Sequence, residues 1–269
     1  MKIKTLAWTL FVLFSTFSWI SCDKDTEEPL SLYDVENNSL ELYYGAKGGV
    51  TIVGGDGNYS FSTESPLVKA EMTYSNYVLF EALNVGDATV TITDQSGHSC
   101  VLKIHIGYYS ENIVVAKLDA TVVGDNMTVG QQKELKEKAL ATIPVKVGGG
   151  YKFVYTDKVN SISGEEDLNP LKGRVYIYSE TYGKEPIEGT FEKTTYKEGD
   201  GQNFSYYTYT LHYKGLNRTL LFQEYIGAVA RSVEFRTYQL AEDLKEQYKT
   251  DYPNVEQVYT SQVIGNIYR

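Results

Sequence analysis

Positive charge is in short supply in this chain. Its 269 residues include 25 Lys or Arg against 35 Asp or Glu, which gives a formal net charge of −10 at pH 7. A chain with such an acidic excess is repelled by the phosphates of nucleic acids and by anionic lipid head groups. We therefore expect no nucleic-acid partner.

Residues that build metal sites are also few, with 2 Cys and 3 His. His98, Cys100 and His105 could be drawn as a zinc site, but their spacing matches no standard zinc pattern. Cys100 and His105 are an odd number of positions apart on one expected strand, so their side chains would point to opposite faces. His212 alternates with tyrosine in another expected strand and has no evident partner. We expect no bound metal and no cofactor.

Familiar catalytic motifs are missing as well. The chain has no Gly-x-Ser-x-Gly elbow and no phosphate-binding glycine loop followed by Lys-Ser/Thr. The acidic run Glu165–Asp167 could supply paired carboxylates for glycoside hydrolysis, but adjacent acids in a loop are typical of a solvated surface. Asp56–Asn58 and Asp200–Asn203 lack the spaced ligands of a calcium loop and favour turns. We expect a non-enzymatic protein, with a hydrolase of dispersed site residues as the least favoured alternative.

Long hydrophobic runs are confined to the N-terminal stretch. Basic residues in Met1–Lys4 precede an apolar run of about 15 residues, Leu6–Ile20, which is shorter than the ~20 residues needed to span a bilayer. Small Ser21 then stands directly before Cys22. This order resembles a bacterial lipoprotein signal. The resemblance implies that residues 1–21 are a signal peptide and that lipid is attached to Cys22 after cleavage.

Residues 22–30 are acidic and have no apolar periodicity, which predicts a flexible tether. Their composition resembles the surface-export signal that follows the lipid cysteine in lipoproteins of Bacteroidota. The resemblance implies an outer-membrane lipoprotein of the cell envelope that is exposed at the cell surface. With Cys22 committed to lipid, Cys100 has no disulfide partner. An ordinary secretory signal beside a chance cysteine is the alternative.

Residues 31–108 have the pattern of a β-sandwich, with short strand-like runs between glycine-rich turns. In Ala88–Thr93 apolar residues alternate with threonines, as in a half-buried strand. Four segments, Gly54–Tyr59, Gly86–Asp94, Gly97 and Leu102–Ile106, resemble the group-2-like bacterial Ig-like domains common in surface proteins of Bacteroidota. The resemblance implies an Ig-like spacer and says little about molecular function.

The chain as a whole is predicted to be mainly β. Residues 109–269 predict an α+β domain with an antiparallel sheet and about two helices. Thr128 and Gln131 form a capping box ahead of a helix expected over 132–143. An apolar repeat of four predicts a second helix over 238–248. Strands are expected at Val145–Val147, Tyr151–Tyr155, Arg174–Tyr178, Gly189–Tyr196, Phe204–Tyr213, Thr219–Ile226 and Val255–Ile267.

Tyrosine is abundant, with 24 residues. Tyr207, Tyr209 and Tyr213 share one face of an expected strand, and we expect them in the core. Exposed tyrosine rings stack on glycans or form protein interfaces. The candidates for such a binding surface are Tyr182, Tyr196 and Tyr206.

These features together favour a non-enzymatic cell-surface lipoprotein. Its Ig-like spacer would present the C-terminal domain for adhesion or for binding a glycan or a surface protein. The alternative is a structural, fimbrillin-like subunit, in which a loose terminal strand such as Val255–Ile267 is donated to a neighbouring copy.

Overall fold

The computed structural model describes residues 29–158, 171–197, 205–229 and 233–268. The chain divides into two compact units, one of residues 1–42 and 47–106 and the other of residues 43–46 and 107–269. The described residues are mainly in β-strands and include two short α-helices, which confirms the prediction of a mainly β protein. Cys22, Glu165–Asp167 and Asp200–Asn203 lie outside the described residues.

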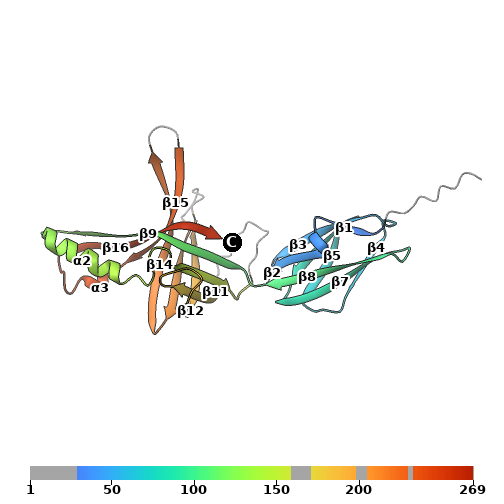
Figure 1. The fold of residues 1–269 in the computed structure, drawn as a ribbon, viewed down its shortest axis with the longest axis horizontal. Coiled ribbons are helices and arrows are strands. Elements are labelled where there is room, and N and C mark those ends of the chain that lie inside the picture. The colour runs from blue at the N-terminus through green and yellow to red at the C-terminus, as the bar shows by residue number, and fades with distance from the viewer. Residues whose placement is uncertain (1–28, 159–170, 198–204, 230–232, 269) are drawn as a thin grey trace, which may run out of the picture. The chain divides into compact units, whose positions relative to one another are not determined.

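Two four-stranded sheets build the first unit (Figure 1). The strands are β1 (Ser31–Tyr33), β2 (Ser39–Tyr43), β3 (Lys47–Val53), β4 (Tyr59–Thr63), β5 (Val68–Tyr74), β6 (Tyr77–Ala82), β7 (Gly86–Asp94) and β8 (Ser99–Gly107), with a 3-10 helix at Glu36–Asn38. One sheet has the order β1-β3-β6-β5 and the other the order β2-β8-β7-β4. The inward-facing side chains of both sheets pack together in a single apolar core, so the two sheets form a sandwich.

Alternation along the strands decides which side chains enter this core. Val90 and Ile92 of β7 are fully buried and pack with Phe80 of β6, while the threonines of β7 face outward. Cys100 pairs with Ile92 across the strands and lies partly buried against the core. Asp56 links two turns of the sandwich, because its carboxylate accepts hydrogen bonds from the backbone N–H groups of Asn58 and Ser96.

The second unit is a closed barrel of eight antiparallel strands. They are β9 (Ser110–Gly124), β10 (Gly150–Tyr155), β11 (Leu171–Tyr178), β12 (Ile187–Lys197), β13 (Ser205–Tyr213), β14 (Leu216–Val229), β15 (Val233–Asp243) and β16 (Val255–Tyr268). Each strand pairs with its neighbour in sequence, and β16 pairs with β9 to close the ring. The antiparallel sheet was predicted, but its closure into a barrel was not.

Aromatic side chains fill the middle of the barrel. Phe153 of β10 stacks on Tyr209 of β13 with ring centroids 4.1 Å apart, and Phe191 of β12 packs edge-on against Phe153 at 5.0 Å. Tyr209 and Tyr213 are buried and Tyr207 packs partly buried on the same cluster, which confirms the prediction that these three tyrosines belong to the core. The interior is therefore a packed core, as expected for a barrel of eight strands.

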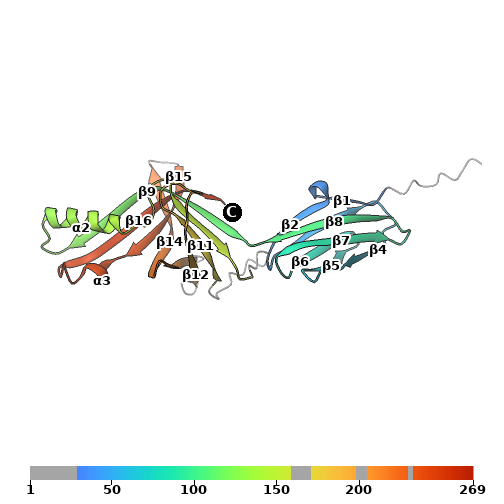
Figure 2. The ribbon, with the colours of Figure 1, turned by 60° about the horizontal axis from the view of Figure 1, so that its bottom comes forward.

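Helix α2 (Val129–Ala141) packs on the C-terminal part of β9 and the N-terminal part of β16, as both ribbon views show (Figure 1 and Figure 2). It begins at the predicted capping box, in which the Thr128 hydroxyl accepts from the Gln131 backbone while the Gln131 side chain accepts from the Thr128 backbone. Leu135 and Ala139 form the buried face of the helix and pack with Val258 of β16. The helix thus extends the apolar core past the end of the barrel.

An ion pair holds the end of α2 to the barrel. Arg218 of β14 and Glu242 of β15 form a buried salt bridge, and the Arg218 guanidinium also donates to the backbone oxygen of Thr142, which caps α2. Both charged groups are nearly excluded from water. Removal of either side chain would therefore leave the other as an unpaired buried charge and would destabilise the protein.

The second predicted helix, over residues 238–248, is wrong for most of its length. Tyr238–Asp243 belongs to β15, and only Lys245–Tyr248 is helical, as α3. Leu240 and Glu242 point inward at the strand period of two, and β15 bonds to both β14 and β16. Hydrogen bonds to strands on both edges stabilise the extended form of this segment more than its apolar repeat of four stabilises a helix.

Two strand predictions also need correction. Val145–Val147 is not a strand: Val145 and Lys146 are irregular and Val147 begins a turn, with Val145 buried and Val147 58% exposed. Val255–Ile267 is a strand as predicted, but it is not loose, because β16 is hydrogen-bonded to β15 on one edge and to β9 on the other. Its donation to a neighbouring copy would open the barrel.

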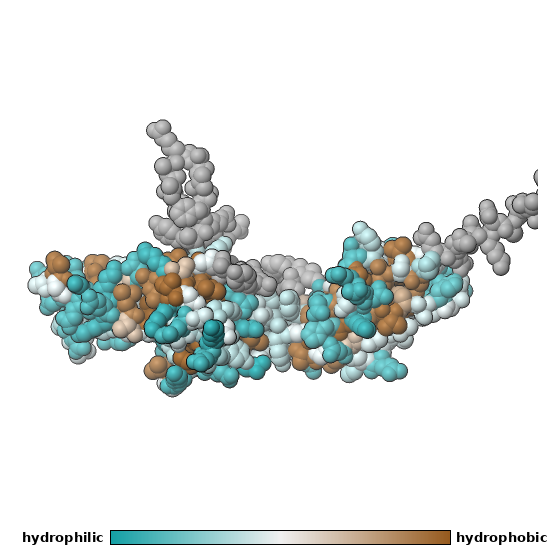
Figure 3. Space-filling view, in the orientation of Figure 1, coloured by the Kyte–Doolittle hydropathy of each residue, from teal (hydrophilic) through white to brown (hydrophobic). Residues whose placement is uncertain are grey.

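The surface of each unit is mixed in character. On the face shown in Figure 3, apolar residues lie in several patches among hydrophilic ones. The helices in the described part of the chain lack the length and the hydropathy of a membrane span.

Candidate functional site

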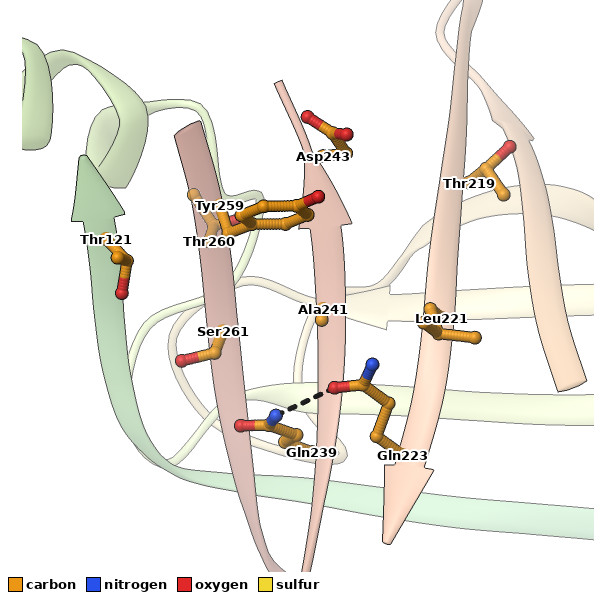
Figure 4. Close-up of a pocket in the computed structure, with 10 residues that line it drawn as sticks. All are labelled: Thr121, Thr219, Leu221, Gln223, Gln239, Ala241, Asp243, Tyr259, Thr260 and Ser261. Carbon is orange, nitrogen blue, oxygen red and sulfur yellow. Dashed lines mark hydrogen bonds between the residues drawn. The ribbon is translucent and has the colours of Figure 1, made fainter. Parts of the chain in front are cut away.

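A groove with a volume of about 570 Å³ lies over β14, β15, β16 and β9 (Figure 4). It is on the outer face of the barrel, since all of its lining except the buried Thr260 alternates along the strands with the inward-facing Leu220, Leu240 and Gln262. The residues that line it are Thr121, Thr219, Leu221, Gln223, Gln239, Ala241, Asp243, Tyr259, Thr260 and Ser261.

Strand register explains the hollow. Ala241 of β15 is paired with Ser261 of β16, and these two small side chains form the floor. On one side of the floor stands a pair of long amides, Gln223 and Gln239, which are cross-strand partners joined by a 2.9 Å hydrogen bond. On the other side stands Tyr259. Small residues between two rows of larger ones leave a groove that is open to solvent.

Tyr259 and Asp243 form the polar end of the groove. They are cross-strand partners, and the Tyr259 hydroxyl points toward the Asp243 side chain (Figure 4). The charge of Asp243 and its hydrogen bond with the hydroxyl raise the pKa of Tyr259. Asp243 is itself held in place, because its Oδ1 accepts from the Lys245 backbone at 2.9 Å. With 41% of Tyr259 exposed, its ring is accessible to a ligand.

This lining suits a polyhydroxylated ligand. An exposed aromatic ring can stack on the apolar C–H face of a sugar, while amides, hydroxyls and a carboxylate exchange hydrogen bonds with its hydroxyl groups. Gln223 and Gln239 face each other, and each amide has donors or acceptors beyond their mutual hydrogen bond. The groove therefore has groups that can bind a sugar. Glycoside hydrolysis uses a pair of carboxylates, and the described lining residues include one, Asp243.

The structure brings together two of the three tyrosines proposed from the sequence. Tyr196 of β12 and Tyr206 of β13 are cross-strand partners on the outer face of the barrel, with rings stacked at 5.1 Å and exposures of 42% and 41%. Tyr182 is elsewhere, in the turn after β11, where it packs on Tyr178 and donates to Asn112 Oδ1 at 2.6 Å. Burial raises the pKa of Tyr182 to about 12.

None of these three tyrosines lines the groove, and the sequence interpretation missed both Tyr259 and Asp243. One signal was present: in the run from Val258 to Gln262, Tyr259 alternates with residues that prove to be buried. Asp243 was hidden because its segment was assigned to a helix.

A buried carboxylate lies inside the barrel. Glu111 Oε2 accepts hydrogen bonds of 2.6 Å from both Tyr155 and Tyr209, and the Lys193 amine lies 3.8 Å from Glu111 Oε1. The same amine lies 4.0 Å above the centroid of the Tyr207 ring. Burial, reinforced by the neighbouring ionisable groups, raises the pKa values of Tyr155 and Tyr209 well above the ordinary value. Both tyrosines therefore act as hydrogen-bond donors that hold the core in place.

The histidines of the sequence-based zinc hypothesis lie in separate acidic pairs. His98 contacts Asp94 at 3.0 Å, and His105 contacts its cross-strand partner Asp87 at 2.7 Å. The hydrogen bond with Asp87 raises the pKa of His105. His212 lies 2.7 Å from Asn217. Across the described part of the chain, no three His, Cys, Asp or Glu side chains gather in a group that could hold a metal ion.

Comparison with known proteins gives no family for this chain. No protein-family model matches it, and no curated protein matches it significantly.

Proposed function

We propose that this protein is a non-enzymatic cell-surface lipoprotein that binds a glycan in the outer groove of its barrel. The observation that carries the proposal is the groove itself, where an exposed tyrosine ring stands beside a carboxylate and a pair of amides. Its volume lies within the ~300–1,000 Å³ range of small-molecule sites. The barrel interior is packed with rings, which favours the outer face as the binding surface.

The other parts of the chain have supporting roles in this proposal. Lipid on Cys22 anchors the protein to the outer membrane, and residues 22–30 form the tether. The N-terminal sandwich is an Ig-like spacer; its two four-stranded sheets around one core are consistent with that assignment. A spacer places the barrel and its groove away from the membrane surface.

A glycan array tests the proposal. The protein would be residues 22–269 with Cys22→Ser, so that no lipid is attached while every residue that the structure describes is retained. We expect binding to a defined set of oligosaccharides. Tyr259→Ala should lower the affinity by about 5- to 150-fold, because removal of a ring that stacks on a nucleic-acid base costs roughly 1–3 kcal/mol and a sugar stacks in a similar way.

Tyr196→Ala is the matched control, since Tyr196 and Tyr259 are exposed to almost the same extent on the outer face of the barrel. It should bind as the unchanged protein does. An array without any bound glycan would contradict the proposal. If Tyr196→Ala abolished binding and Tyr259→Ala did not, the stacked pair Tyr196 and Tyr206 would be the binding surface instead of the groove.

A further inference from the structure

The charge of the groove narrows the class of ligand. Asp243 is the one charged side chain among the described residues that line it. The nearby amine of Lys136 lies 2.9 Å from the carboxylate of Asp119, which is the cross-strand partner of Ser261. This amine is therefore paired outside the groove lining, and the groove has acidic character.

Asp243 and Tyr259 together present the two groups that recognise an ammonium ion. A carboxylate pairs with the positive charge and accepts its N–H donors, and the face of a tyrosine ring attracts a cation through its quadrupole. Asp243 is positioned in advance by the backbone N–H of Lys245 at 2.9 Å and by the Tyr259 hydroxyl. Each carboxylate oxygen can accept more than one hydrogen bond, so Asp243 can still accept the N–H donors of a ligand. The Tyr259 ring stands directly across the strand pair.

We infer that the groove selects saccharides that carry a protonated amine, such as an oligomer of glucosamine, over neutral and acidic ones. This inference rests on the proposed function, and it concerns selectivity at the same site. An acidic saccharide would meet the Asp243 carboxylate as a like charge. A neutral saccharide would cover that carboxylate and remove water from it without supplying a compensating charge. An amino sugar offers its hydroxyls to the amides and its ammonium group to Asp243.

Titration calorimetry at pH 6 would compare a glucosamine oligomer with the N-acetylglucosamine oligomer of equal length and with a uronic-acid oligomer. Residues 22–269 with Cys22→Ser would again be used. We expect the glucosamine oligomer to bind about 3- to 30-fold more tightly than the acetylated one, from an exposed ion pair and one cation–π contact. Asp243→Asn removes the ion pair and should reduce this ratio to about 2- to 5-fold, the share of the cation–π contact with Tyr259. Binding of the acetylated oligomer should be no weaker than before.

Asp125→Asn is the control for net charge, because Asp125 is exposed and does not line the groove. It should keep the preference for the amine. Equal binding of the two oligomers, a preference for the uronic-acid oligomer, or a preference that Asp243→Asn does not reduce would overturn the inference, while binding that depends on Tyr259 would still support the proposed function. If no saccharide bound here or on the array, both would fail.

Discussion

Removal of the Tyr209 hydroxyl tests the role of the carboxylate buried in the barrel. Tyr209 is fully buried and donates a 2.6 Å hydrogen bond to Glu111 Oε2. Tyr209→Phe keeps the ring and its stacking on Phe153 at 4.1 Å, so the change removes little besides the hydrogen bond. It leaves Tyr155 as a donor to the same oxygen.

The expected cost follows from the charge of the acceptor. Buried hydrogen bonds to charged groups contribute about 1.5–3 kcal/mol, roughly twice the value for neutral pairs. Because Tyr155 still donates to Glu111, we expect Tyr209→Phe to lower the free energy of unfolding by about 2 kcal/mol. In a unit of this size that corresponds to a fall of roughly 4–8 °C in melting temperature.

Thermal unfolding followed by far-UV circular dichroism would measure this change. Tryptophan fluorescence is unsuitable for the chain without its signal peptide, because both tryptophans, Trp8 and Trp19, lie within residues 1–21. The control is Tyr206→Phe, which removes the hydroxyl of an exposed tyrosine on the same strand and should alter stability by less than about 0.5 kcal/mol. A Tyr209→Phe protein as stable as the control would refute a stabilising role for the Glu111 hydrogen bonds.

Three further predictions concern other parts of the fold. Thr128→Ala removes the capping box of α2 and should cost about 1 kcal/mol in chemical denaturation, while Thr128→Ser should retain most of the stability. Gly173→Ala would place a Cβ 2.0 Å from the Val154 carbonyl oxygen, so we expect little folded barrel by circular dichroism; a well-folded variant would contradict this packing. Burial disfavours the charge of Asp94, but hydrogen bonds from His98 hold its pKa below the ordinary 3.8, so its contribution to stability is present above about pH 4 and is lost as the pH falls through the lower, folded-state pKa. Melting curves between pH 7 and pH 3 should show this loss, with a weaker pH dependence for Asp94→Asn.

Local patterns in the sequence predicted the parts of the fold that depend on neighbouring residues. The alternation in Ala88–Thr93 identified a strand with one buried face, and Thr128 and Gln131 identified the start of α2. Tyr207, Tyr209 and Tyr213 were assigned to the core because they share one face of an expected strand. In each case the decisive interactions are among residues a few positions apart.

The remaining features depend on pairing between distant segments. Leu240 and Leu244 repeat at four, yet Leu240 enters the barrel core because β14 and β16 pair with both edges of β15. Closure of the barrel requires β9 to meet β16, which no local pattern encodes. The groove has the same origin, since the Ala241–Ser261 floor and the Asp243–Tyr259 pair exist only once the strands are in register. Cys22 is identified by its sequence context alone and remains a prediction.

The pairing of β9 with β16 also determines the order in which the barrel can form. The ribosome makes β9 early and β16 last of the eight strands, so β9 lacks its closing partner until Val255–Tyr268 has been synthesised. During that interval β9 and β15 each present an open edge that another chain could join. Contacts so distant in sequence also slow folding, because loop closure must precede the interactions that stabilise it. The barrel is therefore most vulnerable to aggregation before its last strand has paired.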